Sequence, residues 1–115
     1  MKRSVFLTIP LIFSSAVCFA GGKPATASDI AGIKEAMEDR LKDSDSAKIK
    51  DVRLTGDEKS GWQFCGSVNA KNSYGAYSGF TPFMGMKLKG TDGKISYVVL
   101  GVDDSVEQVC RKYGL

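Results

Sequence analysis

Hydrophobic positions between residues 29 and 41 recur at steps of three and four, as they do on one face of a helix. The apolar set comprises Ile30, Ile33, Met37 and Leu41. This period predicts an amphipathic helix over 29–41, with Ser28 as its N-cap and Asp29 favourable in the first turn. The Asp and Ser residues at 43–46 are expected to stop it.

Alternating patterns follow and predict two strands, over 48–54 and 62–71, separated by turn residues at 56–61. One face of the second strand carries Trp62, Phe64, Val68 and Ala70. The other face carries Gln63, Ser67, Asn69 and Lys71. Cys65 falls with the polar set, so either the C-terminal segment covers that face or Gly66 marks a bulge that changes the phase.

Two further strands are predicted, over 80–89 and 95–102, with a strong turn signal at 90–93. In the first of them Met84, Met86 and Leu88 face one way, and Lys87 and Lys89 face the other. Pro82 indicates that this strand starts at an edge or a bulge. The run 95–102 is apolar on both faces, which is typical of a central strand.

The end of the chain predicts a short helix before Gly114, with Asp104 as its cap. Its inward face is expected to carry Val106, Val109, Cys110 and Tyr113. The order helix, four strands, helix indicates a single small α+β domain over 28–115. We expect an antiparallel sheet of about four strands, an N-terminal helix, a C-terminal helix and one disulfide.

The first twenty residues have the pattern of a secretory signal peptide: Lys2 and Arg3, then an apolar run, then a small residue at Ala20. The run is shorter than the ~20 residues that span a bilayer. Cleavage after Ala20 leaves 21–27 as a flexible leader. We therefore expect a periplasmic or secreted protein of a Gram-negative bacterium, with no stable membrane insertion after cleavage.

Cleavage also changes the charge and the cysteine count. The loss of Lys2 and Arg3 reduces the basic residues from 16 to 14 against 13 acidic residues, a net charge of +1. A nearly neutral chain gives no electrostatic reason to bind nucleic acid. Cys65 and Cys110 remain as an even pair, which an exported chain is expected to oxidise to a disulfide.

Composition also limits the possible chemistry, because the sequence contains no histidine. This excludes Ser-His-Asp and Cys-His mechanisms and zinc sites with histidine ligands. Ser67 and Lys71 are not spaced as Ser-x-x-Lys and lie on a predicted strand, so a catalytic dyad is not expected. The carboxylates Asp43, Asp45, Asp103 and Asp104 lack the spacing of a calcium loop and suit helix ends. No cofactor, metal or catalytic residue is predicted.

The densest segment, FCGSVNAKNSYGAYSGF over 64–80, carries a resemblance. Cys65 to Gly75, followed by Tyr77, Gly79 and Phe80, resembles a motif of small exported proteins of Gram-negative bacteria with no assigned function. The resemblance continues through 109–114 and covers about half of the mature chain. It implies a common fold and the same cysteine pair, and it implies no activity.

The same segment has the composition of a recognition surface, with aromatic rings among amides and hydroxyls. The candidate binding residues are Asn69, Lys71, Asn72, Ser73, Tyr74, Tyr77 and Phe80. The alternative is that the rings belong to the core and the small residues serve turns. We expect a non-catalytic interaction module whose partner is another envelope or extracellular protein. The alternatives are a small periplasmic hydrolase or ligand-binding protein using the same surface, and an accessory component of an envelope assembly.

Overall fold

A computed structural model describes residues 22–38, 40–41, 46–71 and 74–115. The predicted signal peptide and the candidate residues Asn72 and Ser73 lie outside them, as do Asp43 and Asp45. One antiparallel sheet has the strand order β1-β2-β3-β4-β5. The strands are β1 (Lys23–Pro24), β2 (Lys48–Asp57), β3 (Gly61–Asn69), β4 (Thr81–Lys89) and β5 (Ile95–Val102), and the helices are α1 (Ala27–Ala36) and α2 (Val106–Lys112).

The α+β class is confirmed, with five strands where the sequence predicted about four. The additional strand, β1, has only two residues and pairs Lys23 with Leu54 of β2. Two residues are too few to show a period, so this pairing left no signal in the sequence.

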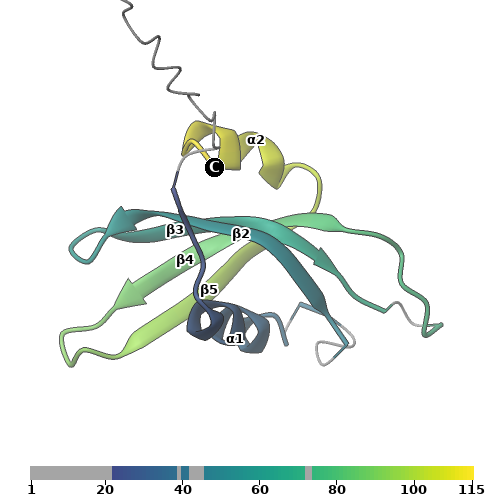
Figure 1. Ribbon diagram of the computed structural model, residues 1–115, viewed down its shortest axis with the longest axis horizontal. Coiled ribbons are helices and arrows are strands. Elements are labelled where there is room, and N and C mark those ends of the chain that lie inside the picture. The colour runs from purple at the N-terminus through teal and green to yellow at the C-terminus, as the bar shows by residue number, and fades with distance from the viewer. Residues whose placement is uncertain (1–21, 39, 42–45, 72–73) are drawn as a thin grey trace, which may run out of the picture.

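The two helices cover opposite faces of the sheet (Figure 1). The main core lies between the sheet and α1, where Phe64 and Phe83 are fully buried and meet edge to face with ring centroids 6.1 Å apart. Its other buried members are Ile33, Met37, Ala47, Val52, Leu54, Val68 and Val99. The longer helix therefore covers the larger apolar face.

Helix α1 starts two residues earlier than predicted, and its N-cap is Thr26, where Ser28 was predicted. It also ends earlier than the predicted residue 41, at Ala36, with Met37 as its C-cap. The Thr26 hydroxyl accepts a hydrogen bond from the Asp29 backbone (3.1 Å), and the Asp29 carboxylate accepts one from the Thr26 backbone (3.0 Å). This reciprocal capping box satisfies two N–H groups at the helix start, which a cap at Ser28 would not do. Ile33 and Met37 are fully buried, as the helical phase predicted.

The Met37 side chain allows a direct test of this phase. Met37→Ala should lower the free energy of unfolding by about 2 kcal/mol, because it leaves a cavity in a fully buried position. The exposed neighbour Glu38 is the control, and Glu38→Ala should change stability by less than about 0.5 kcal/mol. Urea denaturation measures both. Equal losses in the two variants would mean that the buried face of the helix is misassigned.

Cys65 lies on the α2 side of β3. The structure therefore shows whether the C-terminal segment covers this face or a bulge at Gly66 changes the alternation. The pairing of β3 with β4 runs without a break from Trp62 to Val68, so there is no bulge at Gly66 in that ladder. The bulge lies instead in β2, between Lys50 and Arg53, where Asp51 has a positive φ of 57°. The C-terminal helix therefore covers Cys65.

The predicted disulfide is confirmed. Cys65 and Cys110 are bonded, with their Cα atoms 6.1 Å apart, and both residues are buried. The bond holds α2 on the face of the sheet opposite α1 (Figure 1). The predicted cap Asp104 is wrong, because the N-cap of α2 is Ser105, whose side chain makes no capping hydrogen bond. Asp103 stabilises the turn before the helix by accepting hydrogen bonds from the Ser105 backbone and hydroxyl.

Two predictions about the apolar faces are wrong. Tyr113 is 44% exposed because α2 ends at Lys112, one residue before it. Strand β5 is an edge strand, although its apolar residues suggested a central one. Its α1 side is covered at Val99 but not at Ile95, which is 41% exposed, and Val98 and Leu100 are 43% and 50% exposed. In β5, apolar residues on both faces are therefore a feature of an edge strand with exposed side chains and not of a central strand.

Strand β4 keeps the predicted alternation of methionines and lysines. The covered face of β4 is the one that carries Phe83, Gly85 and Lys87, and the methionine face is half-buried. Pro82 lies just before the first pair with β5, Phe83 opposite Val102, so it occupies a locally unpaired edge of β4. Within the described ranges, no helix is both long and apolar enough to cross a membrane.

Candidate functional site

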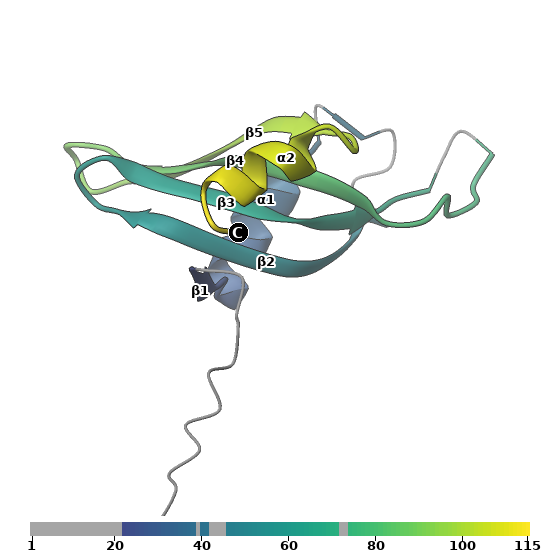
Figure 2. The ribbon, with the colours of Figure 1, turned by 90° about the horizontal axis from the view of Figure 1, so that it is seen from above.

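The predicted binding segment forms the long connection between β3 and β4, which projects beyond one end of the sheet (Figure 2). Two contacts close its base. Lys71 and Tyr77 form an isolated antiparallel bridge, and the Asn69 side-chain oxygen accepts a hydrogen bond from the Gly79 backbone at 3.1 Å. Asn69 and Lys71 thus serve the geometry of the loop as well as its surface.

The aromatic residues of this connection are on the surface and not in the core. Tyr74 is 94% exposed, Phe80 44% and Tyr77 39%. The Tyr77 hydroxyl donates a hydrogen bond to the Ser46 carbonyl oxygen (2.9 Å), which ties the loop to the segment before β2. The rings therefore lie on the surface of the protein, and the base of the loop is held in place.

Lysine side chains lie over two of the rings. The Lys48 ammonium is 4.5 Å from the Tyr77 ring centroid, Lys71 is 5.8 Å from the same ring, and Lys50 is 4.0 Å from the Phe80 ring. Each distance is within the range of a cation–π contact. We define the loop surface as Lys48, Lys50, Asn69, Lys71, Tyr74, Tyr77 and Phe80.

Lys48 and Lys50 were not among the predicted site residues. Antiparallel pairing brings them there, because Lys48 lies opposite Asn69 and Lys50 opposite Ser67. Their alternation along β2 indicates a shared face. The pairing of that strand with the start of the loop could not be known from the sequence, since the β2 bulge sets its register.

Ser67 and Lys71 are not brought together in one cleft. Ser67 lines a shallow cleft of about 250 Å³ beside the disulfide, together with Arg53 and Glu107. Lys71 lines neither this cleft nor the two clefts that are described below, beside Asp29 and beside β5. Its ammonium lies toward the Tyr77 ring. Within the ranges that the structure describes, Ser67 is therefore not placed as a nucleophile for Lys71 to activate.

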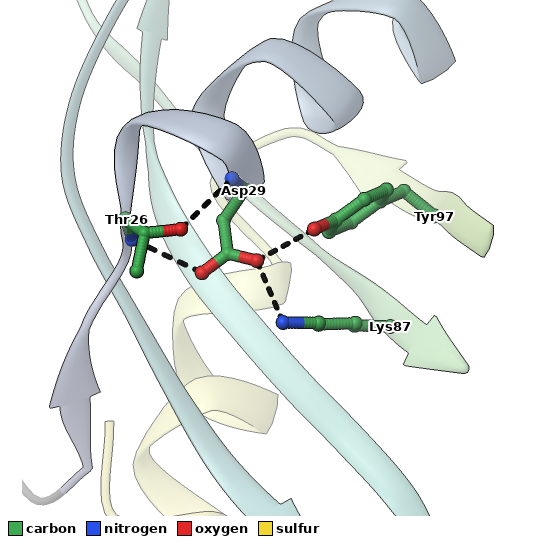
Figure 3. Close-up of polar contacts among 4 residues, drawn as sticks. All are labelled: Thr26, Asp29, Lys87 and Tyr97. Atoms are coloured by element: carbon green, nitrogen blue, oxygen red, sulfur yellow. Dashed lines mark hydrogen bonds and ion pairs between the residues drawn. The ribbon is translucent and has the colours of Figure 1, made fainter. Parts of the chain in front are cut away.

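A second polar cluster, around Asp29, was missed by sequence reasoning (Figure 3). Asp29 is 4% exposed, and its carboxylate accepts hydrogen bonds from the Lys87 ammonium (2.7 Å) and the Tyr97 hydroxyl (2.6 Å), in addition to the Thr26 backbone. It joins α1 to β4 and β5. Gly32 makes room for this contact, because a Cβ atom there would lie 2.3 Å from the Tyr97 ring.

The electrostatics of this Asp29 cluster fix its protonation states. Burial alone would raise the pKa of Asp29, but the hydrogen bonds from Lys87, Tyr97 and Thr26 hold it well below its usual range. Burial and the hydrogen bond to Asp29 raise the pKa of Tyr97 above its usual range. Both shifts move away from neutral pH, so the cluster holds a fixed ion pair and is poorly suited to proton transfer.

A cleft of about 310 Å³ opens beside this cluster, between β1 and the ends of β2 and β4. The Lys87 ammonium contributes to its wall and lies 4.9 Å from the Trp62 ring centroid. Because Lys87 is already paired with Asp29, its charge is compensated within the protein. The cleft is therefore a weaker candidate site than the loop surface.

Comparison with known proteins provides no relative from which a function can be transferred. No family model, curated protein or solved structure matches the chain. The resemblance to small exported proteins stays a prediction from the segment 65–80. The assignment of function therefore depends on the residues of the chain itself.

Proposed function

We propose that this protein is an exported, non-catalytic interaction module that binds another envelope or extracellular protein through the loop surface. The single observation that carries the proposal is the exposure of Tyr74, Tyr77 and Phe80 on a connection that projects from the sheet. Exposed tyrosines that protrude from a fixed base supply contact area with little conformational entropy to lose. Such residues are enriched in protein interfaces.

The lysines of the loop surface add polarity to these rings. Lys48, Lys50 and Lys71 cover ring faces within cation–π distance and keep their charges near the contact area. An aromatic centre with cations beside it favours a protein partner that offers carboxylates around an apolar patch. The surface also suits an accessory component of an envelope assembly, which is the same binding activity in a larger complex.

The alternative of a hydrolase using this surface has less support. It would place Lys71 beside a nucleophile and a carboxylate in a cleft, but the Lys71 ammonium lies toward the Tyr77 ring and Tyr74 is 94% exposed.

Export is supported by the Cys65–Cys110 disulfide, because disulfides persist in oxidising compartments. The predicted mature chain begins at or near Gly21.

The proposal predicts that Tyr74→Ala weakens partner binding at least tenfold. Its ring is 94% exposed, so the folded protein should lose less than about 0.5 kcal/mol of stability, while an aromatic anchor of an interface contributes about 2 kcal/mol. The partner is first captured from a periplasmic extract with the mature protein and identified. Its affinity for the purified variants is then measured by calorimetry.

Tyr113→Ala is the matched control, because Tyr113 is also an exposed tyrosine but follows α2, away from the loop surface. It should leave the affinity unchanged. Equal affinities for the wild type and both variants would rule out the loop surface as the binding site.

A further inference from the structure

The outer edge of β5 is unusual among the strand edges of this protein. Within the described part of the chain, β5 pairs with β4 on one side and with no strand on the other. Its eight residues, ISYVVLGV, include no charged residue and no proline. Proteins normally protect an exposed edge with charges, proline or a bulge, because its unpaired backbone groups attract another strand.

The opposite side of the sheet shows more of those protections, whereas β5 has only a bulge at Leu100. Strand β2 carries the charged residues Lys48, Lys50, Asp51 and Arg53, and it has a bulge at Asp51. The short strand β1 covers part of its edge, since Pro24 lies opposite Arg53. Only the β5 edge thus combines length with high β propensity and an absence of charge.

The side chains at this edge are also apolar and exposed. Ile95 is 41% exposed, Val98 43% and Leu100 50%. A groove beside the first half of the strand is lined by the small residues Gly32 and Ala36 of α1 and by the charged residue Glu35, so space remains along the edge with one carboxylate beside it. Both the backbone and the side chains of β5 are therefore suited to a strand partner.

We propose that β5 pairs antiparallel with β5 of a second copy of this chain, around a twofold axis at Val98. The two flanks of the strand favour a second copy over an unrelated strand, because Lys94 precedes β5 and Asp103 follows it. Antiparallel pairing of β5 with itself brings each Lys94 toward Asp103 of the second copy. The uncharged strand between them meets no like charge.

The register follows from the irregularity that β5 already shows. Val99 lies opposite Gly85 and Gly101 opposite Met84, so Leu100 is an extra residue. With one extra residue counted, pairing Val98 with itself sets Tyr97 opposite Val99 and Ile95 opposite Val102 of the second copy. The next pair is Lys94 with Asp103 of the second copy. The register that brings these opposite charges together therefore also places paired side chains on the same face of the sheet.

This dimer would form one continuous ten-stranded sheet. A twofold axis perpendicular to the sheet reverses the strand direction, so the two β3–β4 connections would project from opposite ends. Each dimer would then present two loop surfaces pointing apart, which favours bridging two partners over binding one partner twice.

Sedimentation equilibrium of the mature protein over a wide concentration range tests the pairing. We expect a reversible monomer–dimer equilibrium that Val98→Lys weakens at least tenfold, because the change places two ammonium groups together at the axis. Leu88→Lys is the control, since Leu88 is similarly exposed but lies on β4, which is paired on both sides. It should leave the dimer intact.

A cross-linking experiment tests the register even if Val98→Lys destabilises the fold. Paired residues at an antiparallel axis have Cα atoms about 4.5 to 5.5 Å apart, within disulfide range. Val98→Cys should therefore oxidise to a covalent dimer. Ile95→Cys should not, because the two copies of residue 95 would lie about 20 Å apart along the strands.

Three results would overturn the proposal. The first is a monomer at every concentration. The second is a dimer that Val98→Lys leaves unchanged. The third is equal cross-linking of Val98→Cys and Ile95→Cys. Open-ended growth of larger assemblies would also contradict it, because a twofold pairing closes at two copies.

Discussion

Asp29→Asn is expected to lower the free energy of unfolding by about 3 kcal/mol, because it removes the anion that joins α1 to the sheet. The carboxylate accepts hydrogen bonds from Lys87 and Tyr97, on two different strands, and from the Thr26 backbone. An asparagine keeps the shape but has one acceptor oxygen and adds an N–H₂ group. It would leave the ammonium of Lys87, whose side chain is only 20% exposed, without its counter-charge. Urea denaturation at neutral pH measures the loss.

Lys87→Met removes the other half of the ion pair. It would leave the Asp29 side chain, which is only 6% exposed, without its counter-charge, so a loss of similar size is expected although the hydrogen bonds from Tyr97 and Thr26 remain. Tyr97→Phe is the milder control and should cost less, since it removes one donor and leaves the ion pair in place. If Asp29→Asn is as stable as the wild type, the cluster does not hold α1 on the sheet.

The contribution of this cluster should depend on pH in a defined direction. The pKa of Asp29 is lower in the folded than in the unfolded protein, so its contribution is present above the unfolded value of about 4 and is lost as the pH falls below it. The pKa of Tyr97 is higher in the folded state, so its contribution is present below about pH 10 and is lost as the pH rises beyond it. The stability difference between the wild type and Asp29→Asn should therefore shrink in acid.

Removing the disulfide should have an effect of similar size. The double variant Cys65→Ala/Cys110→Ala is expected to lose about 4 kcal/mol, from the greater freedom of the unfolded chain when a loop of this length is opened. The bonded residues are 45 positions apart. A domain this small has a total stability of the same order. Thermal unfolding of the oxidised wild type and the double variant measures the difference.

The part of the fold released first should be the C-terminus. Helix α2 has only seven residues, of which Val106 and Cys110 are buried, so little else holds it on the sheet. Hydrogen exchange of the double variant should show loss of protection in 106–112 before the strands. Retained protection there, together with an unchanged melting temperature, would mean that packing alone fixes the helix.

Elements with a long, regular hydrophobic period could be predicted from the sequence. Features that depend on contacts between distant segments of the chain could not. The buried face of α1 followed from Ile33 and Met37, and the disulfide from the count of cysteines. The position of β5 did not follow from its pattern, because apolar residues on both faces are common to a central strand and an uncovered edge. Its neighbours in the sheet decide that question.

The candidate site was predicted to a similar extent. The composition of the segment 69–80 indicated a recognition surface, and Tyr74, Tyr77 and Phe80 are exposed. The Asp29 cluster was missed because its partners lie 58 and 68 residues away along the chain. The only local signal was the spacing of Thr26 and Asp29, which fits a capping box.

The most direct test of the proposed function is photo-cross-linking in intact cells. A benzoylphenylalanine replaces Tyr74 in one variant and Tyr113 in another, and mass spectrometry identifies the cross-linked proteins and the first residue of the mature chain. We expect one dominant envelope protein joined at position 74, no such product at position 113, and a mature chain that begins at or near Gly21. The absence of any protein specific to position 74, or the same products at both positions, would contradict the proposal that the loop surface is a binding site.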